Sequence, residues 1–315
     1  MNKNAITLTV IANMTSNYGE GLGNISSVQK VYRNQKSYAT RSRESLKNAI
    51  CVQSGLYDDL QTSIDGAMQK LVDKDGVNAA TCRALEGGYM STRDLTYIRN
   101  SSFYLTDAVS PNPFINDTRF HNNLYLATNY ANAKGLNVQN NAKDVGLMPY
   151  QYEYDKSLKI YSMTIALDEV GVDKNFDAEA DNEEKCSSRK MKILLKKQYA
   201  EAPNEEKCSR VLALLDAVEN LSLVVKGNLD NAEPVFVVGG LSPRKTHYFE
   251  NAVTMDNNKL HIEPIKQKLG GDFKCGLLKN GEIANEDDIV RELAPLSVPE
   301  FFDKLREQVK SYYSA

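Results

Sequence analysis

The sequence predicts an α+β fold with a ferredoxin-like sheet, a helical insertion and a long β-hairpin-like arm. Four segments have the pattern of strands and two have the pattern of amphipathic helices. Without insertions their order is strand, helix, strand, strand, helix, strand, which is the split βαβ arrangement. Between the second and third strands, residues 111–154 are rich in Asn, Tyr and Pro and have no sustained period. Connections of this length are usually functional arms or lids.

The four predicted strands lie at residues 5–13, 101–109, 158–167 and 234–243. The first alternates between two faces, one with Ile6, Leu8 and Val10 and the other with Thr7, Thr9 and Ile11. The second ends before Pro111 and Pro113, because proline cannot donate to a central ladder. The fourth is predicted to end in a turn at Gly239-Gly240-Leu241.

The predicted helices begin and end at recognisable residues. Thr40 or Ser42 can cap a helix at 42–51 whose apolar face contains Leu46, Ala49 and Ile50. Residues 208–221 form the second amphipathic helix, and 298–313 form a last helix with the stripe Phe301, Leu305 and Val309. Further expectations are small helices and turns over 52–95, a basic helical run at 189–199 and a weak hairpin near residue 260. The repeated hexapeptide at 182–187 and 204–209 predicts two similar helix starts.

Composition narrows the class of protein. The chain has 315 residues, of which 42% are hydrophobic and 25% charged, as in ordinary globular proteins. No run approaches the roughly 18 apolar residues of a membrane span, and the start has no signal-peptide core, so we expect a cytoplasmic protein without a membrane partner. The five cysteines are widely separated and there are three histidines. We therefore expect no disulfide framework, no metal and no cofactor.

Residues 30–47 reverse the sign of the chain's charge. They carry one acid, Glu44, against Lys30, Arg33, Lys36, Arg41, Arg43 and Lys47, whereas the whole chain has a net charge of −3. Guanidinium groups and free N–H groups of a helix start converge well on a phosphate. Composition alone does not separate a phosphate site from a solvated charged loop.

The sequence pI near 5.8 does not exclude a nucleic-acid partner. Residues 168–184 contain eight acids and one lysine, so much of the negative charge lies in one block. A mean charge says little about a field concentrated on another face.

Several motifs resemble one family when taken in order. They are NYGEGLGN at 17–24 after the first strand, the basic loop closing on SRESLK at 42–47, ALEGGYM at 84–90, and VVGGL at 237–241 followed by FENAV at 249–253. Spread over residues 5–255, they resemble the DevR-type backbone subunit of the type I-B Cascade complex in CRISPR immunity, within the RAMP superfamily. Glu44 departs from the pattern, because relatives commonly carry Gln there.

The resemblance implies a hand-shaped molecule with a modified RRM-like palm, a helical finger region and a thumb. The expected division is palm at 1–51, 99–110 and 155–255, finger region at 52–98, thumb at 111–154, and a C-terminal palm extension at 256–315.

The resemblance also implies a non-catalytic scaffold whose copies line up along one CRISPR RNA while each thumb displaces a base. The implied partners are CRISPR RNA, the target DNA strand paired to it, further copies of the chain in a helical filament, and other Cascade subunits. The RNA-binding residues would be Asn17, Tyr18, Lys30, Arg33, Lys36, Arg41, Ser42, Arg43, Lys47, Arg244 and Lys245. The base-displacing residues would come from Phe114, Phe120, His121, Leu147 and Met148.

Two enzyme readings stay open. An endoribonuclease of the same RRM-like superfamily would cut repeat RNA without metal, using His121 or His247 as base with Tyr18, Arg244 or Lys245 assisting. His261 has no nearby acid or nucleophile pattern. A metal-dependent nuclease would use the carboxylates of 168–184, whose run-like spacing is more typical of a solvated acidic loop.

Overall fold

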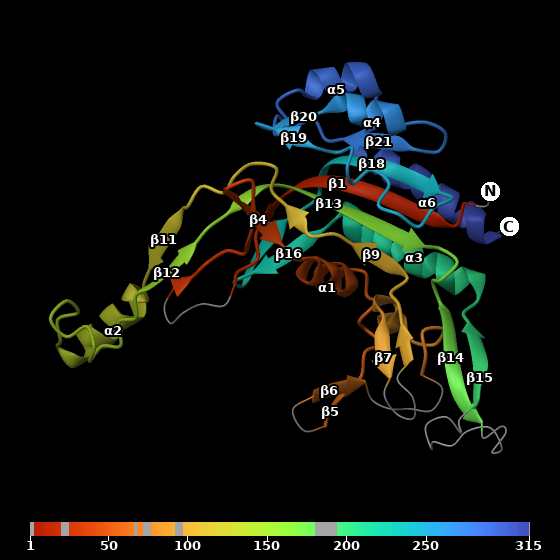
Figure 1. The fold of residues 1–315 in the computed structure, drawn as a ribbon. Coiled ribbons are helices and arrows are strands. Elements are labelled where there is room, and N and C mark those ends of the chain that lie inside the picture. Colours follow the sequence, from red (N-terminus) through yellow and green to blue (C-terminus); the bar gives the residue numbers. More distant parts are fainter. Residues whose placement is uncertain are drawn as a thin grey trace.

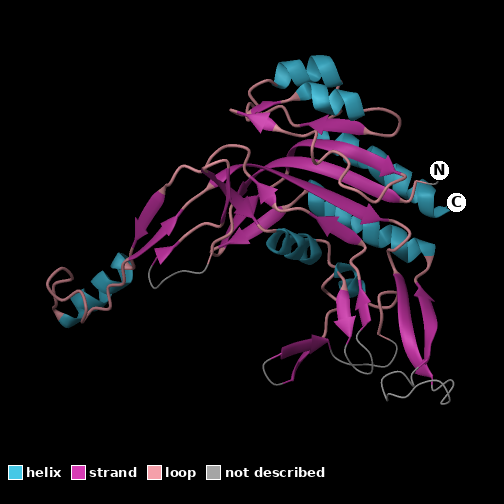
Figure 2. Ribbon diagram, viewed as in Figure 1, coloured by secondary structure: helices cyan, strands magenta, loops and turns pink. Residues whose placement is uncertain are grey.

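The computed structural model describes residues 3–19, 25–65, 68–71, 77–91, 97–179 and 194–314. This part of the chain is a mixed α/β structure, with an eight-stranded sheet and six α-helices (Figure 1, Figure 2). A long arm leaves one end of the sheet, and several hairpins extend from one side (Figure 1). The predicted mixed class is confirmed.

β1 (Ala5–Thr15) lies in the middle of the sheet. It pairs antiparallel with β13 (Lys156–Ala166) on one side and β18 (Pro234–Ser242) on the other. The strand order is β21-β18-β1-β13-β10-β4-β3, and β9 also pairs with β13. The remaining strands are β3 (Lys30–Arg33), β4 (Lys36–Arg41), β9 (Phe103–Leu105), β10 (Ala108–Val109) and β21 (Lys274–Leu277). Residues 101–109 thus form two short strands where one was expected.

The alternation of β1 separates two packed layers, as predicted. Its Ile6, Leu8 and Val10 belong to a core shared with α1 (Arg43–Gln53), α3 (Asn204–Glu219) and α6 (Val298–Ser314). Each fully buried aliphatic side chain stabilises the fold by roughly 1.5–3 kcal/mol. The helices supply the buried residues Leu46, Ile50, Val211, Leu214, Phe301, Leu305 and Val309, so all three predicted apolar faces are confirmed.

The opposite face of the sheet is closed by the C-terminal lobe, which contains β19 (Met255–Asp256), β20 (Lys259–Leu260), α4 (Ile262–Lys268) and α5 (Glu286–Leu293). Ile11 of β1 packs there with Phe249 and Ile265. Thr7 is buried, and its Oγ1 accepts a hydrogen bond from the Tyr248 backbone N–H at 3.1 Å. This face of the central strands is therefore unavailable to a ligand. The hairpin predicted near residue 260 is present as β19–β20.

Gly239 and Gly240 lie inside β18, so the turn predicted there was wrong. A Cβ on Gly239 would lie 2.0 Å from the carbonyl oxygen of Thr7 in β1. Gly240 has φ of 151°, and its Cβ would lie 2.5 Å from the carbonyl oxygen of Asp272. The two glycines let β18 approach its neighbours closely, and they do not reverse the chain.

The finger region contains hairpins where small helices were expected. β5 (Thr62–Asp65) pairs with β6 (Met68–Leu71), and β7 (Tyr89–Ser91) pairs with β8 (Tyr97–Arg99). A 3₁₀-helix, Arg83–Gly87, precedes β7. The segment has no sustained apolar stripe of helical period, so the sequence pattern does not support a long helix there.

A further hairpin joins β14 (Val172–Glu179) to β15 (Leu194–Glu201). β15 covers the described part of the basic run at 189–199, so the helix predicted there was wrong. Leu and Lys are good helix formers, but tertiary context routinely overrides helix propensity, and here antiparallel pairing with β14 does so. The first repeat, at 182–187, lies outside the described residues, whereas the second opens α3 as predicted.

The thumb is a projecting hairpin, as the sequence predicts. β11 (Thr118–His121) pairs with β12 (Tyr150–Glu153), which also pairs with the short β2 (Ile25–Ser26) (Figure 1). The tip carries a helix that was not predicted, α2 (Leu124–Lys134). Its buried face is small, because it consists of Ala127 and Ala131 against Val145. Two alanines give no visible apolar period in the sequence.

A last hairpin, β16 (Ser222–Val225) with β17 (Asn228–Asn231), follows α3. It extends toward the point where the thumb leaves the sheet (Figure 1). None of the helices in the described ranges combines the length and the apolar character that a bilayer crossing requires.

Candidate nucleic-acid interface

The thumb root, where residues 113–118 and 152–156 leave the sheet, holds a polar pocket of about 370 Å³. Lys30 lies in it, with Nζ 2.5 Å from Glu153 Oε2 and 4.6 Å from the centre of the Phe114 ring. Lys36 lines the same pocket. Lys30 is therefore already paired, whereas Lys36 is not held by a carboxylate in the described part of the chain.

The β3–β4 hairpin carries exposed cations at the edge of the sheet. Its turn is formed by Asn34 and Gln35, whose φ values of 49° and 61° are those of a type I′ turn. Arg33 and Lys36 flank this turn and are exposed. Neither makes an ion pair or side-chain hydrogen bond within the described residues, so both are available to a polyanion.

The start of α1 is built as the sequence predicts. Ser42 is the N-cap, and its hydroxyl accepts from the Ser45 N–H at 3.3 Å, while Thr40 Oγ1 donates to the Ala108 carbonyl. Arg43 is exposed, and its Nε lies 3.0 Å from Glu44 Oε1. The hydrogen bond to Glu44 raises the pKa of Arg43. Glu44 is thus held by Arg43.

Arg41 and Lys47 do not face solvent as the basic loop suggested. Arg41 is 6% exposed and donates from Nη1 to the Thr15 carbonyl at 3.2 Å. Lys47 is half-buried, and its Nζ donates to the Gly87 carbonyl at 2.8 Å and to Ser101 Oγ at 2.9 Å. Burial lowers the pKa of both side chains. β4 and α1 turn these two cations inward, where each donates to a backbone carbonyl.

Asn17 and Tyr18 lie between β1 and the thumb. The Asn17 carbonyl oxygen Oδ1 accepts from the Ser42 N–H at 2.9 Å, and its Nδ2 donates to Gln29 at 2.7 Å. The Tyr18 ring meets Tyr152 edge-on with centres 6.0 Å apart. Burial is the largest cause raising the pKa of Tyr18 to about 12, which keeps the phenol protonated.

Lys245 is neutralised by the acidic block. Its Nζ lies 2.8 Å from Asp168 Oδ1 and 2.6 Å from Glu169 Oε1. Partial burial acts to lower the pKa of Lys245, but the two carboxylates outweigh it and raise the pKa. Arg244 is exposed, with no side-chain partner in the described ranges. Of Arg244 and Lys245, only Arg244 is exposed and unpaired within the described residues, as Arg33 and Lys36 are.

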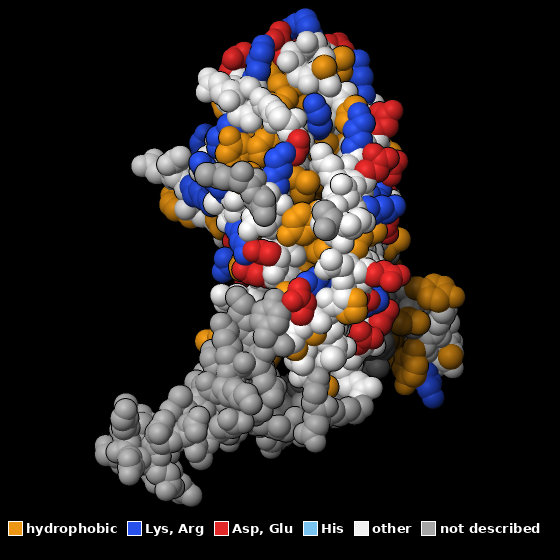
Figure 3. Space-filling view, turned by 90° about the vertical axis from the view of Figure 1, so that its right-hand side faces the viewer, with side chains coloured by type: hydrophobic (Ala, Val, Ile, Leu, Met, Phe, Trp, Pro, Cys, Tyr) orange, Lys and Arg blue, Asp and Glu red, His pale blue; other side chains and the backbone are white. Residues whose placement is uncertain are grey.

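Charges on the face seen in Figure 3 are interspersed, with Lys and Arg side chains next to Asp and Glu over its described part. That face has no single-sign field of the kind that steers a polyanion. Arg33 and Lys36 lie at the thumb root, whereas Arg244 follows Ser242, which pairs with Ala5 at the opposite end of β1.

The predicted thumb residues differ in exposure. Phe120 is 60% exposed and Met148 is 62% exposed, whereas Leu147 packs into the small thumb core and Phe114 lies under Lys30. His121 is stacked against two neighbouring tyrosines, with ring centres 5.5 Å from Tyr150 and 4.7 Å from Tyr152. Phe120 and Met148 are the two suited to contact a partner, together with exposed residues that sequence reasoning missed: Ile115, Leu124, Tyr125, Leu126 and Tyr130.

Two cations were also missed. The Arg119 guanidinium lies 3.6 Å from the centre of the Tyr154 ring. The Lys226 ammonium lies 4.0 Å from the Tyr18 ring centre and 3.8 Å from the Tyr152 ring centre. For Lys226 the available signal was Lys-Gly between two short strand patterns, which is typical of a two-residue hairpin turn.

None of the histidines is arranged as a general base in an open site. The Nδ1 atoms of His247 and His261 lie 2.9 Å from Thr164 and Thr254 hydroxyls. Burial lowers the pKa of His247. The Nε2 of His121 is buried. Within the described ranges, no group of three or more His, Cys, Asp or Glu side chains could hold a metal ion.

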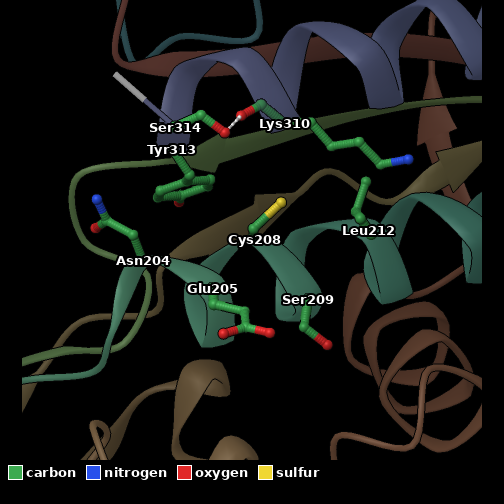
Figure 4. Close-up of a pocket in the computed structure, with 8 residues that line it drawn as sticks. All are labelled: Asn204, Glu205, Cys208, Ser209, Leu212, Lys310, Tyr313 and Ser314. Carbon is green, nitrogen blue, oxygen red and sulfur yellow. Dashed lines mark hydrogen bonds between the residues drawn. The ribbon is translucent and has the colours of Figure 1, made fainter.

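A second groove, of about 470 Å³, lies between α3 and α6 (Figure 4). Cys208 and Leu212 line one wall, and Lys310 and Tyr313 line the other. Burial raises the pKa of the Cys208 thiol, so this cysteine is not an activated nucleophile. The groove lacks the convergent charged groups of an active site.

The chain was compared with solved structures. Two similar solved chains belong to structures described as "CRISPR RNA-guided surveillance complex, pre-nicking" and "CRISPR RNA-guided surveillance complex". The first has a TM-score of 0.58 at 10% identity and covers 97% of this chain and 100% of the other. The second has a TM-score of 0.49 at 13% identity, with coverages of 97% and 99%. The first likeness supports the fold.

The sequence itself gives a family. No curated protein matches it. The model of the family described as "CRISPR-associated negative auto-regulator DevR/Csa2" matches residues 6–258. Because this match spans well over half of the 315 residues, the chain belongs to the CRISPR-associated DevR/Csa2 family.

Proposed function

We propose that this protein is a non-catalytic RNA-binding scaffold. Copies of it would polymerise along a CRISPR RNA as the backbone of a type I Cascade surveillance complex, of subtype I-B, and present the guide to a target DNA strand. The observation that carries the proposal is the pairing of a projecting thumb with uncommitted cations at its root, on Arg33 and Lys36.

A scaffold for many different guides must bind them without reading bases. Phosphate contacts from Lys and Arg do this, since they position a nucleic acid and carry no sequence information. Arg33, Lys36 and Arg43 lie on neighbouring elements, β3, β4 and the start of α1. A sugar-phosphate chain passing along this edge would meet all three.

The palm supports the same mode of binding. The order β18-β1-β13-β9, all antiparallel, with α1 and α3 in one core layer, fits a modified RRM-like fold. RNA-recognition domains stack bases on the sheet face opposite their helices. Here the C-terminal lobe buries that face at Thr7 and Thr9, so we infer that RNA follows the sheet edge and the thumb root.

The thumb supports assembly. It exposes large apolar side chains beyond its own core, Phe120, Leu124, Tyr125, Leu126 and Met148. A head-to-tail contact that does not close on itself generates a filament, which is the form that a linear guide requires. Exposed apolar residues on an arm can also wedge between stacked bases.

The experiment is expression with and without a CRISPR array. The wild type is expected to co-purify with intact guide-length RNA as a multimer, with a high ratio of absorbance at 260 to 280 nm. The R33E/K36E variant should lose that RNA. The K274E/K304E variant makes the same charge change at two exposed lysines, on β21 at the opposite edge of the sheet and on α6, and should retain the RNA. Equal RNA content in both variants would contradict the proposal.

The same preparation tests the endoribonuclease reading. Incubation with labelled repeat RNA should leave the RNA uncut. Specific fragments that vanish in H121A or H247A would favour the enzyme and overturn the scaffold assignment. The stacked, partly buried setting of His121 supports the outcome without cleavage.

A further inference from the structure

Lys226 occupies an unusual position at the tip of the β16–β17 hairpin. Its ammonium group lies over two aromatic rings from different parts of the chain, 4.0 Å from the centre of Tyr18 and 3.8 Å from that of Tyr152. Tyr18 follows β1, and Tyr152 is in β12 of the thumb. One side chain thus joins the hairpin to the thumb root.

Lysine is an unfavourable residue for the first position of this turn. Lys226 has φ of 49°, and Gly227 has φ of 79°. Two-residue turns of this type favour Asn-Gly, because asparagine adopts the left-handed conformation with less strain than lysine does. A strained residue persists where the surrounding structure holds it, and here the two rings do so.

The rest of the hairpin is fixed to the palm. Asp230 accepts from the Thr15 N–H at 2.8 Å and from Lys156 Nζ at 2.6 Å, where β1 ends and β13 begins. At the base of the hairpin, the Ser222 N–H donates to Gln53 at the end of α1, 2.9 Å away. Because its base and middle are attached to the palm, the hairpin holds its tip at a fixed place relative to the palm.

We propose that Lys226 is a positioning residue that tethers the β16–β17 hairpin to the thumb root and so fixes the angle of the thumb to the palm. The hairpin then acts as a strut, attached to α1 and to β1 and β13 at one end and to Tyr18 and Tyr152 at the other. The inference concerns the free chain and does not depend on the proposed function.

The experiment measures the distance between thumb and palm directly. Spin labels are placed at N129C on α2 and N48C on α1, both exposed positions. Cys186 and Cys208 are replaced by serine in this background, while the buried Cys51, Cys82 and Cys275 are kept. Pulsed electron double resonance is expected to give one narrow distance distribution for the chain with Lys226.

Three variants separate a tether from a turn residue. K226N keeps or improves the turn but removes the cation, so the narrow distribution should be lost although the melting temperature is not lowered. K226R keeps a cation over both rings and should restore it. V224S changes an exposed residue of the same hairpin without altering the cation, and should leave the distribution unchanged.

A K226N distribution as narrow as that of the parent chain, at the same mean distance, would overturn the proposal. Broadening in V224S as in K226N would also overturn it, because the effect would then belong to the hairpin in general and not to the cation.

Discussion

The Arg99 guanidinium donates to the Glu86 carboxylate across 3.0 Å, and both side chains are shielded from solvent. The other carboxylate oxygen of Glu86 lies 2.8 Å from Arg210 Nη1 and 2.6 Å from the Gly171 N–H. Glu86 comes from the 3₁₀-helix, Arg99 from β8 and Arg210 from α3. One buried carboxylate therefore connects the base of the finger region to the palm.

Replacing Glu86 by alanine should lower the free energy of unfolding by about 3–5 kcal/mol, since removing one member of a buried pair leaves the other charges uncompensated. Urea unfolding measures the change. The matched control is Asp303→Asn, which removes an exposed partner of Arg306 and should cost under about 1 kcal/mol. A similar loss of unfolding free energy in both variants would show that the Glu86 cluster does not contribute strongly to stability.

Lys47→Met should destabilise the protein by roughly 1–3 kcal/mol, because the Gly87 carbonyl loses its buried donor. RNA affinity should keep its salt dependence, since this ammonium does not point at solvent. Arg43→Ala provides the contrast: it should barely change stability and should weaken RNA binding. Denaturant titration and filter binding on the two variants distinguish these roles. The assignment fails if Lys47→Met reduces the salt slope.

Arg33→Ala with Lys36→Ala should reduce the slope of log affinity against log salt by about 0.7 for each lost contact to a single-stranded RNA phosphate. The loss should be the same for guides of unrelated sequence. Lys274→Ala with Lys304→Ala, at exposed positions far from β3 in the sheet order, should leave the slope unchanged. Titrations of an unstructured oligonucleotide over a range of salt concentrations give these slopes.

Sequence patterns predicted the long elements of the palm, the strands at β1, β13 and β18 and the helices at α1, α3 and α6, because each of them has a buried apolar face. Alternation in β1 placed Ile6 and Ile11 in different cores, and the helical spacing of Leu46 and Ile50 placed them inward. Local chemistry gave Thr40 and Ser42 as the two candidate caps, and Ser42 is the cap in the structure. Short elements without such a face were not predictable, which is why the hairpins of 52–98 were taken for helices and α2 was missed.

The candidate site shows a different limit of prediction from sequence. A run of basic residues reveals its charge but not which side chains turn inward. Arg41 and Arg43 are two positions apart, yet Arg41 ends a strand of the central sheet and is buried, while Arg43 begins a helix and is exposed. Lys47 finds its partner at Gly87, which no local pattern connects to it. Long-range packing decided these outcomes.

Stability should decrease as the pH falls below about 6.5, the ordinary value for histidine. Burial lowers the pKa of His247 in the folded chain, and Glu250 only partly opposes this. Between the two pKa values the unfolded chain binds more protons than the folded one, so lowering the pH favours unfolding. His247→Gln should remove this component from the pH dependence of urea unfolding. Parallel pH profiles for the variant and the parent would contradict the assignment.

Removing the thumb tip should leave the palm intact and abolish assembly. An Asn-Gly turn can replace residues 122–149, because His121 and Tyr150 are already paired across the hairpin. The deleted segment carries its own small core of Ala127, Ala131 and Val145, separate from the cores of the palm, so the melting temperature should hardly change.

Size-exclusion chromatography and light scattering with guide RNA should then show short species in place of long multimers. Tyr125→Ser with Leu126→Ser is the matched variant. It keeps α2 but removes two exposed apolar side chains, and it should weaken assembly to a smaller extent. Filaments of normal length from the truncated chain would place the contact between copies elsewhere, since an arm that is absent cannot supply it.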